Sequence, residues 1–281
     1  ELSASEGIRV PAGDFSAKIM VKVGQLNSKD FPANKKYAIP LSITGASNYS
    51  LIPSQRSAIL LLNRSILSSV AKVSGGEGIR IKPVGMHTKA EWTIQMSAIY
   101  SSLTRSNLTT AYLSNGTGGE FYTRISSTAG IQVKNGRDGD DTWTQIPLQA
   151  GKWLHITYVH KDKKTTVYVN GKVQKVFENS AITFGENSMI VVGNSGYRND
   201  YLREIRLWDK ALTESEINDY LYLPMDPATP HLISYLPLSK EMETKDLKAP
   251  AGTENVTTKA RIEYVENVKF PADELVIVNQ E

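Results

Sequence analysis

Residues 151–171 read GKWLHITYVHKDKKTTVYVNG and contain the clearest strand–turn–strand pattern in the chain. Trp153 opens a strand of largely apolar residues, and a charged turn at Lys161–Lys164 separates it from a second strand, Thr165–Val169. The second strand ends in Asn170-Gly171, a pair that tolerates positive φ at both turn positions. The segment therefore predicts antiparallel strands joined by tight turns.

A second block, Tyr201–Ile217, reads YLREIRLWDKALTESEI and predicts a strand that runs straight into a short helix. Thr213 is the expected helix cap, and Glu216 stands three residues later, which makes a capping box. Apolar residues continue to Leu221, and Pro224 ends the pattern. This is the one convincing helix in the sequence.

Together the two blocks resemble laminin-G-like, concanavalin A-type domains. The resemblance rests on Trp153, His155, Ile156 and Tyr158; on Tyr168–Gly171; and on Leu202, Glu204–Trp208, Lys210–Thr213, Glu216 and Ile217. It implies a β-sandwich whose surfaces bind sugars or proteins, with catalysis only where specific carboxylates are added. Arg203 stands where many relatives carry Asp, so no role of that Asp is transferred. The segment Pro230–Leu238 looks like the opening strand of such domains, which implies a rearranged strand order.

The bulk composition excludes several classes of protein. The chain has 281 residues, a formal net charge of +3 and no cysteine. Acidic and basic residues are interspersed, which argues against a nucleic-acid surface. Absence of cysteine rules out disulfides and thiolate metal sites, and no stretch approaches the roughly 20 apolar residues of a membrane span. The chain shows no signal peptide but opens at Glu1 without Met, which is typical of a processed or trimmed chain, so export to the cell surface, outer membrane or periplasm stays open.

Before residue 74, strand-like segments occur at Ile19–Val23, Tyr37–Ile43 and Ala58–Leu62. Pro40 places the second of these at an edge or a bulge, because proline cannot donate to the ladder. These segments predict a small immunoglobulin-like sandwich over residues 1–74. The glycine-rich run Ser74–Gly78 is the expected linker.

Residues 79–281 are expected to form a larger concanavalin A-like jelly-roll sandwich, so the fold class is all-β. Short strands recur at spacings near ten residues, which is the pattern of a sandwich or barrel. The later segments His231–Leu238, Ala260–Val265 and Leu275–Val278 are expected to complete its sheets. The expected strands before them are Ile79–Val84, Trp92–Ala98, Thr110–Leu113, Phe121–Ile125, Ile131–Lys134, Trp153–His160, Thr165–Val169, Val173–Phe177, Met189–Gly193 and Tyr201–Trp208.

The N-terminal region resembles a small β-sandwich domain of unknown function found on exported lipoproteins of gut Bacteroidetes. The residues that carry this resemblance are Lys36–Ile43, Tyr49–Leu51 and Ala58–Leu62. It implies glycan capture at the bacterial cell surface or outer membrane, within a polysaccharide-utilisation system. Outer-membrane uptake proteins are the implied protein partners, and a lipid anchor outside this chain is the implied membrane contact.

Candidate catalytic residues are few. Glycoside hydrolysis needs two carboxylates on either side of one bond, and the E-x-D-x-x-E string of catalytic relatives is absent. Glu241 and Glu243 have a spacing of two but lie in a polar, loop-like run. His155 shares a strand face with Trp153 and is expected to be a hydrogen-bonded core residue. We therefore predict that the protein is not an enzyme.

A calcium site is one interpretation of Asp138, Asp140 and Asp141, which place three carboxylates in four residues. The run is not an EF-hand loop, because Thr142 and Trp143 stand where Asp or Asn and Gly are required. A solvated acidic turn is the competing interpretation.

Sugar recognition uses aromatic faces with neighbouring polar groups, gathered on a face or on loops of a sandwich. Loop or strand-end aromatics include Tyr122 and Trp143, whereas Trp92, Trp153 and Trp208 lie inside expected strands and are assigned to the core. The residues predicted to bind the ligand are Trp143, Asn194, Tyr197, Arg198 and Tyr201.

The sequence therefore predicts a non-catalytic protein that binds a polysaccharide or other glycan at the cell surface. Two alternatives stay open. The first is a structural or protein–protein interaction module of a surface complex, and the second is a glycoside hydrolase.

Overall fold

A computed structural model describes residues 7–279, with gaps at 25, 28, 33–34, 63–64, 77, 86–88, 104–108, 113–120, 135–139, 179–181, 186 and 194–196. For residues 109–112, 140, 197 and 198 it describes the backbone alone. The chain divides into two compact units, Glu1–Asn63 and Arg64–Glu281. They are called here the N-terminal unit and the sandwich unit.

Within its described residues, the N-terminal unit contains one antiparallel sheet, made of β1 (Tyr37–Ser42) and β2 (Ser57–Leu62), and a 3-10 turn η1 (Pro53–Gln55). Pro40 lies in an edge strand, as expected, since β1 pairs with β2 alone. The expected small sandwich is not seen in this part of the chain, and residues 19–23 form no named strand. Alternating apolar residues show that a segment suits a sheet, but a strand also needs a hydrogen-bonded neighbour.

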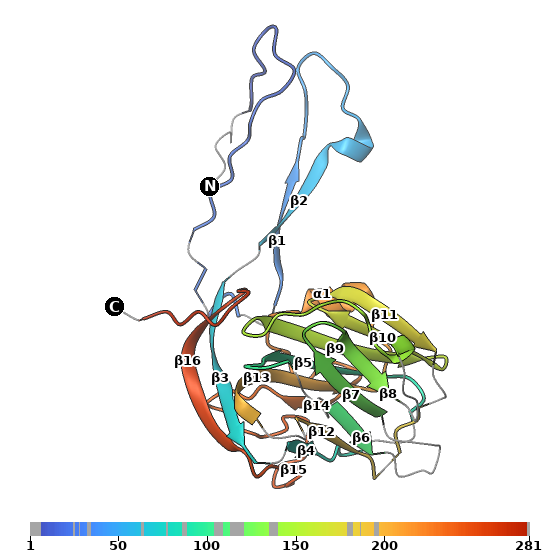
Figure 1. Cartoon of the computed structure of the whole chain (residues 1–281). Coiled ribbons are helices and arrows are strands. Elements are labelled where there is room, and N and C mark those ends of the chain that lie inside the picture. The colour runs from blue at the N-terminus through green and yellow to red at the C-terminus, as the bar shows by residue number, and fades with distance from the viewer. Residues whose placement is uncertain are drawn as a thin grey trace. The chain divides into compact units, whose positions relative to one another are not determined.

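The sandwich unit consists of two antiparallel sheets, whose strands Figure 1 labels. The eight-stranded sheet has the order β11 (Lys172–Glu178), β10 (Lys164–Val169), β9 (Trp153–Lys161), β5 (Trp92–Ile99), β13 (Tyr197–Trp208), β3 (Ile66–Gly75) and β16 (Arg261–Phe270), with β14 (Leu232–Leu236) also beside β13. The six-stranded sheet has the order β15 (Val256–Thr257), β4 (Ile79–Ile81), β12 (Met189–Val192), β6 (Thr109–Tyr112), β7 (Phe121–Ser126) and β8 (Gly130–Lys134). The all-β prediction is confirmed.

The β9–β10–β11 meander has the tight turns that the sequence predicts. Asp162 and Lys163 both have positive φ (50° and 62°), as do Asn170 and Gly171 (50° and 76°). Two successive residues with positive φ are the type I′ turn, whose twist matches that of the flanking strands. The Asn170 side chain also accepts from the amide of His155 and so joins the turn to the start of β9.

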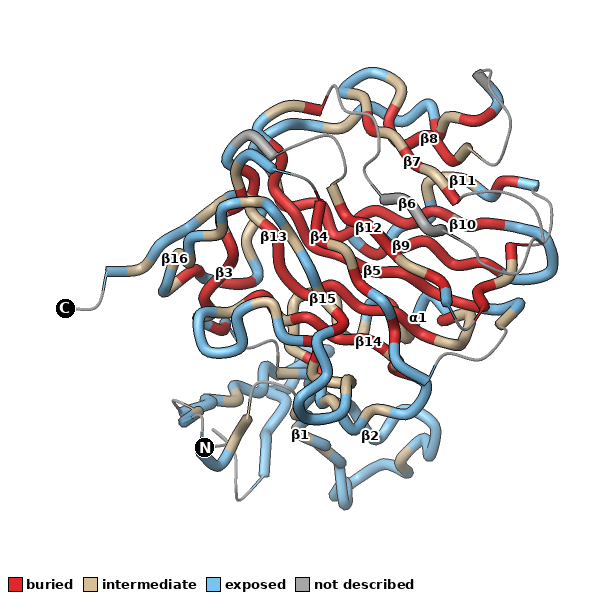
Figure 2. Tube along the Cα trace, turned by 90° about the horizontal axis from the view of Figure 1, so that it is seen from below, coloured by how far each residue is buried: buried red, intermediate tan, exposed pale blue. Residues whose placement is uncertain are grey.

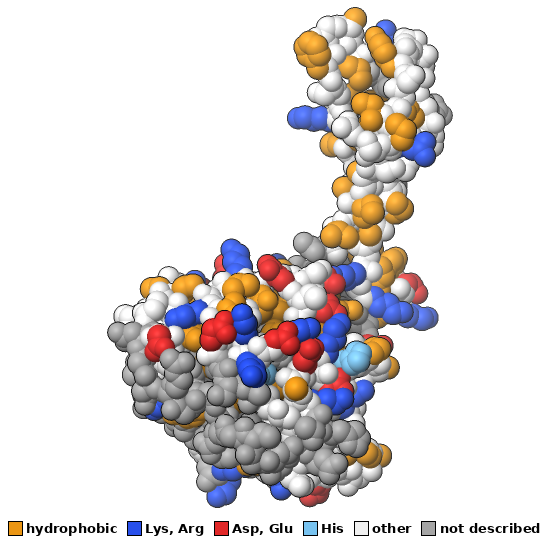
Figure 3. Space-filling model, turned by 90° about the vertical axis from the view of Figure 1, so that its right-hand side faces the viewer, with side chains coloured by type: hydrophobic (Ala, Val, Ile, Leu, Met, Phe, Trp, Pro, Cys, Tyr) orange, Lys and Arg blue, Asp and Glu red, His pale blue; other side chains and the backbone are white. Residues whose placement is uncertain are grey.

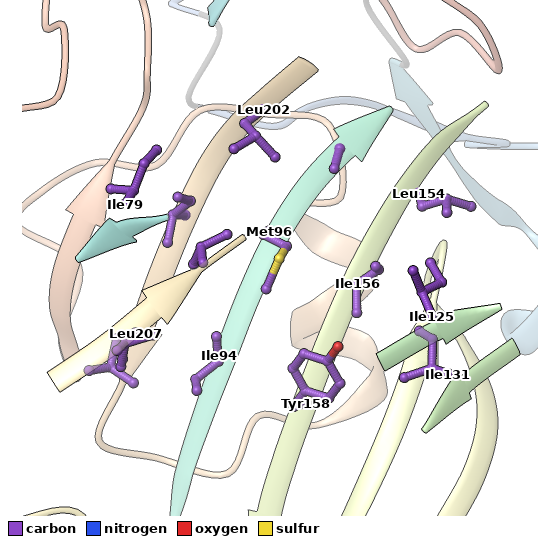
Figure 4. Packing of buried hydrophobic residues seen from close by; sticks show 14 of the residues in the cluster. Ile79, Ile94, Met96, Ile125, Ile131, Leu154, Ile156, Tyr158, Leu202 and Leu207 are labelled. Atoms are coloured by element: carbon purple, nitrogen blue, oxygen red, sulfur yellow. The ribbon is translucent and has the colours of Figure 1, made fainter. Parts of the chain in front are cut away.

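The core lies between the two sheets and follows from alternation along each strand. Ile94 and Met96 of β5 and Ile156 of β9 meet Ile125 and Ile131 of the other sheet (Figure 4). Figure 2 shows this layer as buried backbone running through both sheets. Burial of these side chains is the main favourable term for the fold.

The outward face of the eight-stranded sheet is also buried, because α1 (Glu214–Asp219) and its flanks cover it. Thr213 and Glu216 form the predicted capping box. Trp208 of β13 and Ile217 of α1 belong to this second apolar cluster. His155 faces this side as a buried residue, with Nδ1 2.7 Å from the Ser97 hydroxyl, so the prediction of a core histidine is confirmed.

One strand explains why the unit boundary differs from the predicted linker. β3 precedes the glycine-rich run at Ser74–Gly78, yet it pairs with both β13 and β16 inside the eight-stranded sheet. The boundary therefore lies between Asn63 and Arg64, about ten residues before the expected position. Glycines at 75 and 76, both with positive φ, form the turn after β3 instead of a linker between domains.

The C-terminal segments complete the sheets of this unit, as expected. β14 pairs with one half of β13 and β3 with the other half, so two strands share one edge. The expected strand at Leu275–Val278 is reduced to a bridge between Ile277 and Val268 of β16. No helix in the described residues is long and apolar enough to cross a membrane.

Candidate functional site

The outward face of the six-stranded sheet presents polar and aromatic side chains. In β7, Phe121, Thr123 and Ile125 are buried, so alternation turns Tyr122 and Arg124 to the other side. Tyr122 pairs with Lys134 of β8, and Arg124 pairs with Gln132. Residues that pair directly across antiparallel strands lie on the same face. These four side chains are therefore neighbours.

Trp143 extends this row beyond the edge of β8. It forms an antiparallel bridge with Gln132, which places the two residues side by side. Its side chain is half-buried. We call the set Tyr122, Arg124, Gln132, Lys134 and Trp143 the β7–β8 face.

A lysine from the other sheet holds the backbone at Trp143. The Lys175 ammonium of β11 donates to the main-chain carbonyl of Asp141 at 2.8 Å and to that of Trp143 at 2.7 Å. Two charge-assisted hydrogen bonds thus fix the aromatic residue at the sheet edge.

Two cations lie near the Tyr122 ring. The Arg124 guanidinium carbon is 5.2 Å from the ring centroid and the Lys134 ammonium is 5.9 Å from it. Arg124 Nε also donates to the Tyr122 hydroxyl at 3.1 Å. The side chains of Tyr122 and Arg124 therefore support one another, and both are half-exposed.

Gln132 adds an unsatisfied acceptor to this face. Its side chain is 2% exposed, and Nε2 donates to the Thr142 hydroxyl at 2.8 Å. Its Oε1 has no hydrogen-bond partner in the described part of the chain. A buried polar atom without a partner is costly, and water or a ligand hydroxyl would satisfy it.

The residues predicted to bind a ligand do not form one cluster among those that the structure describes. Trp143 lies on the β7–β8 face, whereas Tyr201 pairs with Lys72 on the outward side of the eight-stranded sheet. Tyr197 and Arg198 are described as backbone at the start of β13, and Asn194 lies outside the described residues.

The acidic triplet is described only in part. Asp138 lies outside the described residues, the backbone of Asp140 opens η2 (Asp140–Thr142), and Asp141 is exposed. Within the described ranges, no three Asp, Glu or His side chains are grouped to hold a metal ion. The carbonyls of Asp141 and Trp143 already accept from the Lys175 ammonium, which a metal ion at these oxygens would have to displace.

A second polar cluster lies buried under the segment after α1. Glu204 accepts from Arg206 and from the Tyr235 hydroxyl, and Arg203 stacks over the Phe270 ring at 4.0 Å. The two arginines donate to the carbonyls of Tyr220, Tyr222 and Leu223. All three charged side chains are buried. Their hydrogen bonds hold the chain after α1 against the sheet, so we assign the cluster a structural role.

Two histidines of β9 are held neutral by burial. Burial lowers the pKa of His160 to about 4, and burial together with Arg206 and Arg203 holds the pKa of His155 well below its ordinary value. His160 accepts from the amide of Ile182 at Nε2 and stacks on Trp92. Both rings lie inside the unit and serve as packing residues.

A pocket of about 400 Å³ opens between the start of β3, the end of β14 and the turns at residues 239–242. Three carboxylates line it. Glu204 is paired with Arg206, Glu241 accepts from Ser69, and Glu266 is paired with Lys240. Because each carboxylate already has a partner, we do not place a catalytic pair here.

Sequence reasoning found Trp143 and noted Tyr122, but it missed Arg124, Gln132 and Lys134. The available signal was the alternation of β7 and β8, in which these residues occupy the outward positions. Loop composition could not reveal them, because they lie in strands.

Comparison with solved structures identifies the same architecture. A Bacteroides ovatus protein, provisionally named a carbohydrate binding protein, superposes with a TM-score of 0.57 at 18% identity over 85% of this chain and 71% of its own. A pentraxin from Limulus polyphemus matches with a TM-score of 0.46 at 12% identity over 71% of this chain and 94% of its own. A sialidase from Trypanosoma rangeli matches with a TM-score of 0.42 at 15% identity over 53% of this chain and 27% of its own. At 18% identity, the match to the Bacteroides ovatus protein shows the fold alone.

No curated protein sequence matches the chain. The family model described as the concanavalin A-like lectin/glucanases superfamily matches residues 74–218, just over half of the 281 residues. The matched region runs from the end of β3 to α1 and contains both blocks on which the expected resemblance rests. The chain therefore belongs to the concanavalin A-like lectin/glucanases superfamily.

Proposed function

We propose that this chain is a non-catalytic carbohydrate-binding protein and that the β7–β8 face holds the saccharide. The observation that carries the proposal is the row of Arg124, Gln132 and Trp143 across three adjoining backbone segments, with Tyr122 beside it. Two half-exposed aromatic side chains thus accompany a guanidinium and an amide on one sheet face.

The chemistry of a pyranose ring suits this face. Its axial C–H groups form an apolar surface that stacks on aromatic rings, and its hydroxyls need directed hydrogen bonds. The rings of Tyr122 and Trp143 offer the first kind of contact. The half-exposed guanidinium of Arg124 offers donors to the hydroxyls.

Binding without hydrolysis is part of the proposal. A glycosidase acts with two carboxylates on either side of the bond that it cleaves. The strand residues of β7 and β8 include no Asp or Glu. Incubation with a bound polysaccharide should therefore release no reducing ends, and their release would contradict this part of the proposal.

We also propose a setting for this activity. The resemblance of residues 36–62 to domains of Bacteroidetes lipoproteins supports a role at the cell surface, in a glycan-utilisation system with uptake proteins as partners. Protease accessibility on intact cells of the source organism would test the location. Protection of the protein in intact cells would contradict it.

Affinity electrophoresis against a broad polysaccharide panel tests the binding proposal. At least one polymer should retard the protein, and Trp143→Ala and Tyr122→Ala should each abolish the retardation. Tyr201→Ala is the matched control, because it removes a half-exposed aromatic residue from the other sheet. Failure of the folded protein to bind any polymer would overturn the proposal, as would a loss confined to Tyr201→Ala.

The N-terminal unit supports a second candidate function, protein–protein interaction. One face of its sheet carries Tyr37, Ile39 and Leu41 from β1 opposite Leu62, Leu60 and Ala58 from β2. On the other face Ile59 and Leu61 are 69% and 72% exposed. Figure 3 shows hydrophobic side chains spread over the surface of this unit.

We propose a second copy of this chain as the partner for the face that carries Tyr37, Ile39 and Leu41 of β1. Tyr37, Ile39, Leu41, Ala58, Leu60 and Leu62 are all uncharged, so identical faces meet without repulsion, and a twofold interface needs a self-complementary surface. Light scattering after gel filtration should give a dimer for the wild type and a monomer for Leu60→Glu. A monomer at every concentration of the wild type would exclude this partner.

A further inference from the structure

We infer that the saccharide taken by the β7–β8 face is anionic, carrying carboxylate or sulfate groups. The inference rests on the proposed function, since it names the class of ligand for the same face. It is motivated by the way in which charge is divided between the two sheets.

As the structure bounds them, the six strands of the six-stranded sheet contain three basic residues and no Asp or Glu. The basic residues are Arg80 of β4, Arg124 of β7 and Lys134 of β8. The eight-stranded sheet, by contrast, mixes both signs, for example Glu263 with Lys72 and Glu178 with Lys164. Of the two sheets of the sandwich unit, only the six-stranded one therefore lacks acidic residues in its strands.

All three cations lie on the outward side of that sheet. Ile79 and Ile81 flank Arg80 and belong to the core, as do Phe121 and Ile125 around Arg124. Alternation therefore directs the charged residues away from the core. Asp141, the first acidic residue after β8 whose side chain is described, belongs to η2 rather than to a strand.

Arg124 is the residue best placed to bind an anion. Among the described residues, its guanidinium contacts the Tyr122 ring and hydroxyl but forms no salt bridge. Nε is engaged with the hydroxyl, and neither terminal nitrogen has a hydrogen-bond partner in the described part of the chain. A guanidinium presents paired donors to a carboxylate or a sulfate, and such bonds are about twice as strong as neutral ones.

The neighbours of Arg124 fit an acidic sugar ring. Tyr122 lies beside it on the same strand, and Lys134 lies across from Tyr122 and adds a second positive charge within 5.9 Å of the ring. A sugar ring beside Tyr122 would thus have both cations within reach of its acidic substituent.

The experiment compares each acidic polymer with its neutralised form on the full chain. Polygalacturonate and its methyl ester form one pair, and dextran sulfate and dextran form the other. We expect the protein to bind at least one acidic polymer about tenfold or more tightly than its neutral form. The pair that shows the preference identifies carboxylate or sulfate as the acidic group.

Variants separate this inference from general charge attraction. Arg124→Gln should lose about tenfold in affinity for the acidic polymer and nothing for its neutral form. Lys172→Gln, an exposed lysine of β11, is the matched control and should bind as the wild type. Thermal melting checks that each variant is folded.

The outcomes distinguish the two proposals. Equal affinity for an acidic polymer and its neutral form, with no effect of Arg124→Gln, would overturn the anionic class and leave carbohydrate binding standing. An equal loss in Arg124→Gln and Lys172→Gln would show diffuse attraction and would also overturn it. Absence of binding to every saccharide, acidic or neutral, would overturn both.

Discussion

The Glu204 carboxylate accepts two hydrogen bonds from the guanidinium of Arg206, 2.5 Å from Nη2 and 3.2 Å from Nε. The two residues stand two positions apart in β13, where the backbone is irregular and Glu204 has a φ of 56°. This irregularity lets Arg203 and Arg206 turn to one side of the sheet with Glu204 between them. One buried carboxylate thus serves two buried guanidinium groups.

Glu204→Gln should destabilise the sandwich unit by about 3–5 kcal/mol, because the change leaves two buried cations without a counter-charge. Chemical denaturation monitored by tryptophan fluorescence would measure this loss. Glu263→Gln is the control, since its partners Lys72 and Arg261 are exposed in part or in large part, and such pairs contribute roughly 0–1 kcal/mol. Equal effects of the two variants would show that Glu204 does not hold the cluster together.

Gly171→Ala should lower the melting temperature through contact with α1. A Cβ at this position would lie 1.9 Å from Asn218 Oδ1, and the residue has a φ of 76°. Gly252 has a similar φ of 83°, but a Cβ there would meet no atom within 4 Å. Gly252→Ala therefore reports backbone strain alone, about 1 kcal/mol, and Gly171→Ala should cost more. The same melting temperature for both variants would contradict a close approach of α1 to the turn.

Stability should fall as the pH drops from about 6.5 towards 4. His160 binds its proton with a pKa of about 4 in the folded chain and near 6.5 when unfolded, so between these values the unfolded state holds more protons. This contribution is fully present above pH 6.5 and is lost on acidification, at up to ~1.4 kcal/mol per pH unit. His155 adds a change of the same sign.

The variant His160→Gln isolates this effect. Denaturation free energies at several pH values should show a shallower pH dependence than in the wild type, by about one proton. The low pKa of His160 fits its surroundings. Nε2 accepts a hydrogen bond from the amide of Ile182, and a protonated Nε2 would place two donors against each other. An unchanged slope would mean that another group titrates.

Lys175→Met should loosen the segment that carries Trp143. The change keeps the length of the side chain but removes both hydrogen bonds to the carbonyls of Asp141 and Trp143. We expect a loss of about 1–3 kcal/mol and weaker retention on any polysaccharide that the protein binds. Lys172→Met on the same strand is the control. Full retention by Lys175→Met would show that the position of Trp143 does not depend on this lysine.

The sequence predicted the sandwich well where local chemistry is decisive. The pair Asn170-Gly171 favours a tight turn, and Thr213 with Glu216 favours a helix cap. Both could therefore be predicted without any tertiary information. Burial of Trp153 and His155 followed from strand alternation. Such signals depend on a few neighbouring residues, so a single sequence is enough to recognise them.

Other features depend on partners distant in the chain, and the sequence could not provide them. The glycine run after β3 was interpreted as a linker, because nothing local shows that β3 pairs with β16. The outward position of Arg124 and its proximity to Trp143 depend on the register of β7, β8 and the bridge at Gln132. Register is set by the whole sheet, so this group of residues became visible only in three dimensions.

The pairing of β3 with β16 also bears on how the protein is made. Ile66 of β3 lies opposite Phe270 of β16, so the first strand of the sandwich unit meets its last named strand. During synthesis β3 leaves the ribosome early, and one of its two neighbours, β16, is made only after nearly the whole unit. Closing so long a loop is slow, and an apolar strand edge left open attracts other chains. We therefore expect the nascent unit to be most prone to aggregation between these two events.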